Sequence, residues 1–229
     1  MNIDYEKECK LQLKKNIKEF RENITKPNTI KKVINWAKKY DLSPDFVKYK
    51  ICTDDIFALF FVKDPIKQGT HEKTAAYILE SFAFISEFKN LDNGGKNAKV
   101  INNGMIVSLE ESKKSSSNPK TIDFEWKIKT NKDIIINCYV SHKYTKANGG
   151  SQDNQYKDLQ NFMANARLNK ENNSLFFAIC DGEYYQRKNK ETNKNKLQEL
   201  NEDYGKDNKL IALTINEIYD YIEDYIENN

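Results

Sequence analysis

The chain has 229 residues, 38% of them hydrophobic, which is enough for one α/β domain with a helical extension. Its net charge is only +3, so composition alone indicates no strongly basic field for nucleic acid. Two isolated histidines and four separated cysteines disfavour structural zinc, and no apolar run reaches membrane-spanning length. The opening MNIDYEKECK lacks the apolar core of a signal peptide, so we expect a cytoplasmic protein.

The first sixty residues show the apolar spacing of helices. Hydrophobic side chains recur at helical intervals over residues 5–24, and Pro27 interrupts the pattern. A second helix is predicted from Thr29 to Tyr40, and Ser43-Pro44 begins a third segment. We therefore expect one nuclease domain over residues 1–229, with a helical N-terminal part (1–60) and a catalytic core (65–229).

The middle of the chain combines one predicted helix with four predicted strands. The helix runs from about Thr70 to Phe88 and ends before the sequence Asp-Asn-Gly-Gly. The strand candidates are rich in β-branched and aromatic residues: Val100–Leu109, Ile122–Ile128, Asp133–Tyr144 and Leu175–Cys180. We expect the first three to form a meander, and a helix from about Ser151 to Leu168 to precede the fourth.

The last part of the chain begins with a polar stretch from Tyr184 to Gly205. It continues with a short strand from Leu210 to Ile215 and a closing helix with Asn216 as its N-cap. This order of elements predicts an α/β fold with a mixed central β-sheet flanked by helices and a helical N-terminal extension.

Two of the predicted strands place chemically useful side chains together. Because side chains alternate between faces, Asp123 and Glu125 share one side of their strand, as Ser141 and Lys143 do of theirs. If these strands pair as an antiparallel hairpin, Asp123 approaches Lys143. Mg²⁺ prefers oxygen ligands and an ammonium group can orient water, so the pair suits metal-assisted phosphodiester hydrolysis. A cross-strand salt bridge on a solvated face is the alternative.

The order of parts over residues 65–180 resembles the PD-(D/E)XK nuclease superfamily, and within it the type II restriction endonucleases. The run SHKYTKANGGSQDNQYKDLQNF is similar to the lysine strand and the helix after it, and KDPIKQGTHEKTAAYIL is similar to the leading helix. The resemblance implies that Asp123 binds Mg²⁺, that Lys143 is the motif lysine and that Glu72 is the helix glutamate. It also implies a PD-(D/E)XK-like core.

Ser141 departs from the family pattern, which normally has Glu or Asp two positions before the lysine. Some restriction enzymes of the superfamily also have serine there and take a carboxylate from the next helix. A serine supplies no negative charge, so another side chain is expected to provide the second metal ligand. The candidates are Asp153, Asp158, Glu125, Glu72 and Glu80.

Several polar residues near the lysine strand are candidates for contact with substrate. Gln155 and Tyr156 are similar to the Gln and Tyr that several superfamily nucleases carry there, although ordinary polarity of a first helical turn is the alternative. The segment Asp181–Lys196 mixes tyrosines with basic residues and suits contacts to phosphates and base edges, or else is a solvated loop. The expected DNA contacts are Lys146, Asn148, Gln152, Asn154, Tyr185, Arg187 and Lys188.

Three functions follow from these residues. The first is Mg²⁺-dependent, sequence-specific cleavage of double-stranded DNA, in a restriction system with a cognate DNA methyltransferase in the same cell. The second is a repair or recombination nuclease of the same superfamily, and the third is a catalytically silent DNA-binding or protein-binding module in which Ser141 marks a lost ligand. A palindromic site is most simply read by a homodimer, with the N-terminal helices forming its interface or a DNA wall.

Overall fold

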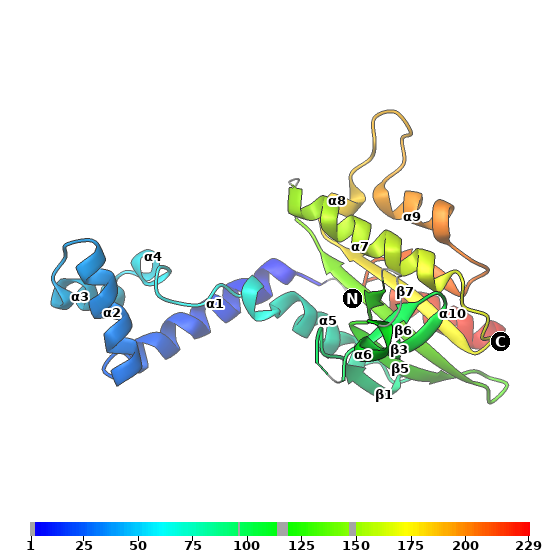
Figure 1. The fold of residues 1–229 in the computed structure, drawn as a ribbon, viewed down its shortest axis with the longest axis horizontal. Coiled ribbons are helices and arrows are strands. Elements are labelled where there is room, and N and C mark those ends of the chain that lie inside the picture. Colours follow the sequence, from blue (N-terminus) through cyan, green and yellow to red (C-terminus); the bar gives the residue numbers. More distant parts are fainter. Residues whose placement is uncertain (1–2, 96, 114–118, 147–149) are drawn as a thin grey trace. The chain divides into compact units, whose positions relative to one another are not determined.

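The computed structural model describes residues 3–95, 97–113, 119–146 and 150–229, without the side chains of residues 150–152. The chain forms two compact units, one of residues 4–74 and one of residues 1–3 with 75–229 (Figure 1). We call them the helical unit and the sheet unit. The expectation that both belong to one nuclease domain stays a prediction.

The helical unit confirms the three helices predicted near the N-terminus. Its elements are α1 (Tyr5–Glu22), α2 (Pro27–Lys39), α3 (Pro44–Thr53), α4 (Asp55–Ala58) and the 3-10 turn η1 (Ile66–Gln68). Ser43 caps α3, because its side chain accepts a hydrogen bond from the backbone N–H of Phe46. Val33 and Ala37 of α2 pack with Val47 and Ile51 of α3 in a fully buried core.

The sheet unit is built on a mixed five-stranded sheet in the order β1-β5-β6-β7-β8. The strands are β1 (Ser86–Asn90), β5 (Phe124–Lys129), β6 (Ile135–Tyr144), β7 (Ser174–Asp181) and β8 (Leu210–Leu213). The pairs β1·β5 and β5·β6 are antiparallel, whereas β6·β7 and β7·β8 are parallel. A mixed sheet flanked by helices confirms the expected α/β class.

Helices cover both faces of this sheet. Phe176 of β7 packs against Phe162 of α7 (Gly150–Ala166), with ring centroids 6.5 Å apart. The next residue, Phe177, points to the other face and meets Tyr221 of α10 (Ile218–Asn228), with centroids 5.8 Å apart. The predicted helix between the lysine strand and the next strand is therefore confirmed, and it packs directly on the sheet.

The predicted helix from Thr70 to Phe88 is wrong in its second half. Helix α5 covers only Thr70–Glu80, and Ser86–Asn90 form the edge strand β1. Lys89 pairs with Glu125 of β5 in that strand, and the backbone hydrogen bonds of this pairing outweigh the helical spacing of the apolar residues. Glu87 adopts a left-handed φ of 51° where the register of the pairing shifts.

The predicted strand Val100–Leu109 and the predicted meander are also wrong. This segment folds into the hairpin β2 (Lys99–Asn102) and β3 (Met105–Ser108), which joins β4 (Lys120–Thr121) in a separate three-stranded sheet. Asn103 and Gly104 form the turn, with positive φ values of 50° and 82°. An Asn-Gly pair with positive φ at both positions is the favoured two-residue hairpin turn, which explains the break.

The C-terminal part contains more helix than expected. The polar stretch holds α8 (Glu183–Gln186) and α9 (Lys196–Tyr204). In the middle of the chain, the short helix α6 (Leu109–Ser112) follows the small hairpin. The prediction of Asn216 as an N-cap is wrong, because α10 starts one residue later than that, after Glu217. The carboxylate of Glu217 accepts a hydrogen bond from the backbone N–H of Thr214. No helix in the described residues has the length and apolarity to span a membrane.

Candidate active site

The register of β5 and β6 brings Asp123 to Lys143. Glu125 lies opposite Tyr139 in this antiparallel pair, and the backbone N–H of Asp123 donates to Val140 O at 2.7 Å. Lys143 Nζ then reaches Asp123 Oδ2 at 3.4 Å. The predicted convergence of the two side chains is therefore present in the structure, on the face of the sheet that also carries Ser141.

The carboxylate of Asp123 is buried, with 3% of its side chain exposed. Its Oδ2 atom accepts a hydrogen bond from the backbone N–H of His142 at 2.7 Å and lies 3.4 Å from Ser141 Oγ. Its Oδ1 atom is equally buried and has no hydrogen-bond partner within the described part of the chain. Since a buried carboxylate oxygen without a partner is costly, this atom is where a cation or another donor would be most stabilising.

The carboxylates expected to join Asp123 have other partners. Asp153 Oδ1 accepts a hydrogen bond from Tyr184 OH at 2.9 Å, and Asp158 forms an ion pair with Lys120. Glu72 belongs to the helical unit, so its assignment as a metal ligand stays a prediction. In the described residues, no group of three or more His, Cys, Asp and Glu side chains has the geometry to hold a metal ion.

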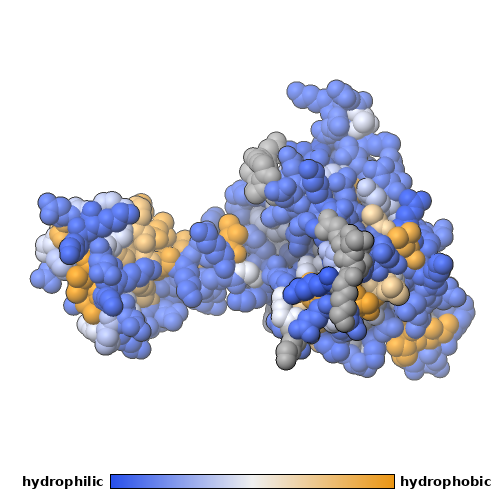
Figure 2. Space-filling view, viewed as in Figure 1, coloured by the Kyte–Doolittle hydropathy of each residue, from blue (hydrophilic) through white to orange (hydrophobic). Residues whose placement is uncertain are grey.

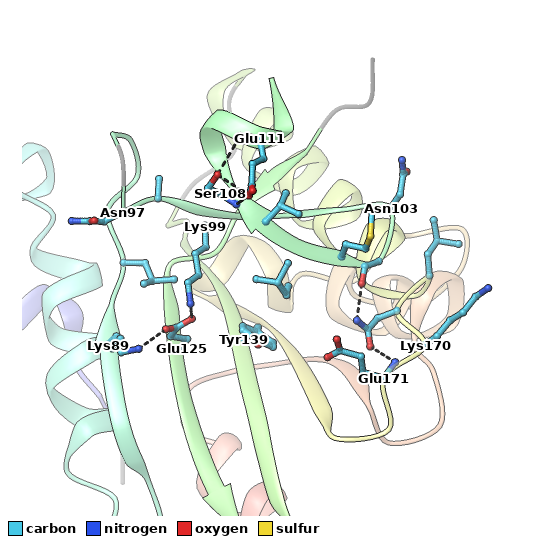
Figure 3. A pocket seen from close by; sticks show the side chains of 18 residues that line it. Lys89, Asn97, Lys99, Asn103, Ser108, Glu111, Glu125, Tyr139, Lys170 and Glu171 are labelled. Carbon is cyan, nitrogen blue, oxygen red and sulfur yellow. Dashed lines mark hydrogen bonds and ion pairs between the residues drawn. The ribbon is translucent and has the colours of Figure 1, made fainter. Parts of the chain in front are cut away.

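Glu125, another expected metal ligand, is held by two lysines. Its carboxylate lies 3.0 Å from Lys89 Nζ and 2.5 Å from Lys99 Nζ, beside a cavity of about 1150 Å³ between the main sheet and the small sheet (Figure 3). Burial raises the pKa of Glu125, but the hydrogen bonds and charges of Lys99 and Lys89 outweigh it, so the pKa is lowered. These contacts satisfy Glu125 without a metal and do not support its predicted role.

Gln155 and Tyr185 meet at Thr145, just after the lysine strand. The Thr145 hydroxyl contacts Gln155 Oε1 and lies 3.3 Å from Tyr185 OH. Tyr185 has no exposed surface and belongs to the core beneath α7, so its predicted contact with DNA is wrong. These hydrogen bonds fasten the start of α7 to β6 and α8, which gives Gln155 a structural role beside the site.

A buried pair that the sequence did not reveal supports Asp123 from the opposite face of the sheet. The ring of His142 lies 3.1 Å (Nε2) from Asp181 Oδ2, and both side chains are buried. Asp181 Oδ1 also accepts a hydrogen bond from Ile215 N at 3.0 Å. Because the backbone N–H of His142 binds Asp123, this network links the ends of β6, β7 and β8 to the candidate catalytic carboxylate.

The residues expected to contact DNA have different surroundings. Arg187 and Lys188 are exposed at the start of a hairpin-like loop between α8 and α9, which projects from the sheet unit in Figure 1. Lys146 and Asn154 are also exposed. Asn148 and the side chain of Gln152 lie outside the described residues. The loop is anchored at its base, where Lys196 Nζ lies 4.3 Å from the ring centroid of Tyr156.

The comparisons with known proteins identify no relative from which a fold or a function could be carried over to this chain. No family model, characterised protein or solved structure matches this chain. The resemblance to the PD-(D/E)XK nucleases therefore stays a prediction from sequence motifs and element order. Any assignment of function rests on Asp123, Lys143 and the groups around them.

Proposed function

We propose that this chain is a Mg²⁺-dependent endonuclease of the PD-(D/E)XK kind that cuts double-stranded DNA at a specific sequence, as a type II restriction endonuclease. The observation that carries the proposal is the buried carboxylate of Asp123, whose Oδ2 holds Lys143 while Oδ1 has no partner in the described residues. A buried salt bridge is stabilising only when hydrogen bonds also satisfy the remaining lone pairs of its carboxylate. Here one oxygen is left for another ligand.

The donor set around Asp123 fits a Mg²⁺ ion that shares its coordination with substrate. Mg²⁺ is commonly held by one or two carboxylates together with water and phosphate oxygens, so a cage of three protein carboxylates is not required. Asp123 Oδ1 would be the direct protein ligand, and the neighbouring hydroxyl of Ser141 is a neutral oxygen within the same cluster. When bound, the ion would polarise the scissile phosphate.

The protein groups have separate tasks in this proposal. Lys143 is 20% exposed, so its ammonium group remains accessible to a phosphate oxygen or to the attacking water while it contacts Asp123. The backbone N–H of His142 fixes the orientation of the Asp123 carboxylate. A phosphate in the site would therefore meet a positioned cationic group and a positioned carboxylate, which is the arrangement needed for in-line attack by water.

The loop between α8 and α9 is the proposed contact with the DNA duplex. It carries Arg187, Lys188 and Lys190 on an exposed projection, whereas the tyrosines before it are buried in the core. Cationic side chains on a projecting loop suit the phosphate backbone and a groove edge. A restriction function further implies a cognate DNA methyltransferase in the same cell, and a homodimer if the site is palindromic.

A plasmid cleavage assay with Mg²⁺ tests the proposal. Asp123→Asn keeps an oxygen to accept the hydrogen bond of His142 but removes the negative charge, and Lys143→Ala removes the ammonium group. Each variant should cut roughly a thousandfold or more slowly than the wild type, because each loses several kcal/mol of transition-state stabilisation. The matched control is Lys129→Ala, in an exposed ion pair at the far end of β5, which should cut at the wild-type rate.

The pattern of products separates the alternatives. Defined fragments from a closed plasmid support site-specific cleavage, whereas cutting confined to branched or free-ended DNA favours a repair or recombination nuclease. Binding without cleavage at any Mg²⁺ concentration favours the silent module, a candidate supported by Ser141, which stands where the family pattern has Glu or Asp. Wild-type cutting by Asp123→Asn or Lys143→Ala contradicts the assigned site.

A further inference from the structure

The cavity beside Glu125 is a place in the sheet unit that the proposed cleavage reaction does not use. Its volume is about 1150 Å³, and neither Asp123 nor Lys143 lines it. Pockets that bury a drug-sized molecule have volumes of about 300–1000 Å³, so a single bound ion would leave most of this cavity to water. The cavity therefore has room for an organic ligand.

The end of the cavity at Glu125 offers cationic hydrogen-bond donors. Lys89 and Lys99 both contact the Glu125 carboxylate, so two positive charges share one negative charge. Each ammonium group has three N–H donors and, in the described part of the chain, gives one of them to Glu125. A phosphate monoester carries a charge of about −1.5 to −2 and has three strong acceptor oxygens. This end of the cavity therefore suits a phosphate group.

The opposite end offers acceptors instead. Figure 3 shows Glu171 and Asn103 on the other side of Tyr139 from Glu125 and Lys89. One oxygen of Glu171 accepts a hydrogen bond from the Ser174 hydroxyl at 2.9 Å. A carboxylate has about four acceptor positions, so Glu171 can also accept from a ligand. A carboxylate and an amide suit the N–H groups of a nucleobase.

The floor between the two ends is largely apolar. Leu91, Ile106 and Tyr139 are partly buried and pack against the core, while Met105 and Leu168 line the cavity at 62% and 56% exposure. The surface of the sheet unit is mostly hydrophilic in Figure 2, so these exposed apolar side chains differ from their surroundings. Burial raises the pKa of Tyr139 to about 12, so its hydroxyl stays protonated and can donate at neutral pH. A flat ring fits such a floor.

From these three parts, we infer that the cavity is a binding site for a nucleoside monophosphate, with the phosphate at Lys89 and Lys99 and the base toward Glu171. The strands β5 and β7 are two strand spacings apart, about 10 Å, which is of the order of the length of such a ligand. The other carboxylate at the cavity, Glu111, accepts hydrogen bonds from Ser108 in the cap of α6. The inference does not rest on the proposed endonuclease function.

Calorimetric titration of the full chain tests the inference. The probes are the four ribonucleoside 5′-monophosphates, each compared with inorganic phosphate and with the matching nucleoside. At least one monophosphate is expected to bind roughly tenfold or more tightly than either of its parts, because both ends of the cavity contribute. Binding should weaken as salt is added. Undetectable binding of all four at millimolar concentration overturns the inference, as does equally tight binding of inorganic phosphate alone.

Substitutions of lysine test where the phosphate lies. Lys99→Met keeps most of the apolar stem and removes the ammonium group, so the dissociation constant should rise about tenfold. Lys89→Met, at a more exposed position, should weaken binding in the same direction without risk to the fold. The matched control is Lys127→Met, because Lys127 is as exposed as Lys99 and pairs with Glu87 outside the cavity. Wild-type affinity in both Lys99→Met and Lys89→Met contradicts the site.

Glu125→Gln distinguishes an anion site from a structural cluster. The substitution removes a negative charge next to the expected phosphate and keeps both lysines, so the nucleotide should bind at least as tightly as to the wild type. A cluster needed only to shape the cavity would lose affinity when Glu125 is changed, and that result overturns the inference. Lys143→Ala should bind the nucleotide like the wild type. Loss of binding in this variant would instead place the ligand at the candidate active site and overturn the assignment to the cavity.

Discussion

The two compact units leave opposite kinds of side chain in unfavourable surroundings. The helical unit exposes Ile56 at 75% and Phe60 at 65%, although water is a poor environment for both. The sheet unit instead buries charged groups, with Asp123 and Asp181 at 3% and 4% exposure. Each arrangement is incomplete in a different way, since an exposed apolar patch needs a protein surface and a buried carboxylate needs a donor or a cation.

Within the sheet unit, the buried acidic groups differ in how fully they are satisfied. Asp181 has His142 and the Ile215 backbone N–H, and Glu125 has two lysines. Asp123 alone among these three leaves a carboxylate oxygen without a partner in the described chain. The comparison separates carboxylates that hold the fold together from the one that is available for chemistry, and the following substitutions test that separation.

Asp181→Ala should have the largest effect on folding. Removal of this carboxylate leaves the Ile215 N–H and the His142 ring without their buried acceptor, which costs roughly 3 kcal/mol in the free energy of unfolding. Denaturant unfolding measures the loss. Asp181→Asn retains one acceptor oxygen and should lose less, and Glu202→Ala, in an exposed ion pair with Lys194, should lose under about 1 kcal/mol. Equal stability of Asp181→Ala and wild type would show that the network is not structural.

The substitution Ser141→Asp tests whether a cation binds beside Asp123. Ser141 is 4% exposed and its Oγ lies 3.4 Å from Asp123 Oδ2, so a second carboxylate there should cost roughly 2 kcal/mol of stability without metal. Mg²⁺ should then restore stability, with a larger rise in melting temperature than in the wild type. Ser141→Ala is the uncharged control and should not gain this response. An absent Mg²⁺ response in Ser141→Asp would count against a metal at Asp123.

The sequence could predict the Asp123–Lys143 contact because it depends on a local rule. Side chains alternate along neighbouring antiparallel strands, so one correct pairing fixes which residues share a face. The contact between His142 and Asp181 depends instead on the parallel pairing of β6 with β7, across the intervening helix α7. No spacing within one segment could indicate that His142 has a buried acidic partner.

The errors in the predicted site residues follow from errors in the predicted helices and strands. Lys89 directly follows the segment predicted as a helix, and Lys99 lies in the small sheet. Their convergence on Glu125 therefore required an edge strand and a hairpin that apolar spacing did not reveal. Tyr185 follows β7 in a polar segment, yet the turn of α8 directs it into the core. Periodicity identified the long strands and helices, whereas short elements were determined by tertiary pairing.

The smallest expected effect is that of Glu125→Gln, which removes one charge from the Glu125–Lys89–Lys99 cluster. Both lysines are partly exposed, at 59% and 39% of their side chains, so solvent weakens the pairs and the cost at neutral pH should be about 1 kcal/mol. Glu87→Gln is the matched control, because Glu87 pairs with Lys127 across the same two strands but is 58% exposed. It should cost only a few tenths of a kcal/mol.

The lowered pKa of Glu125 predicts how the effect of Glu125→Gln on the free energy of unfolding depends on pH. The pKa of Glu125 lies below its ordinary value of 4.5 in the folded protein, so the ionised carboxylate contributes stability at pH values above 4.5. That contribution is lost as pH falls through the folded pKa, where Glu125 becomes protonated and resembles Gln. Unfolding free energies of wild type and Glu125→Gln should therefore differ at pH 7 and converge in acid. A difference that persists unchanged below the folded pKa would mean that the lysines do not hold Glu125 through its charge.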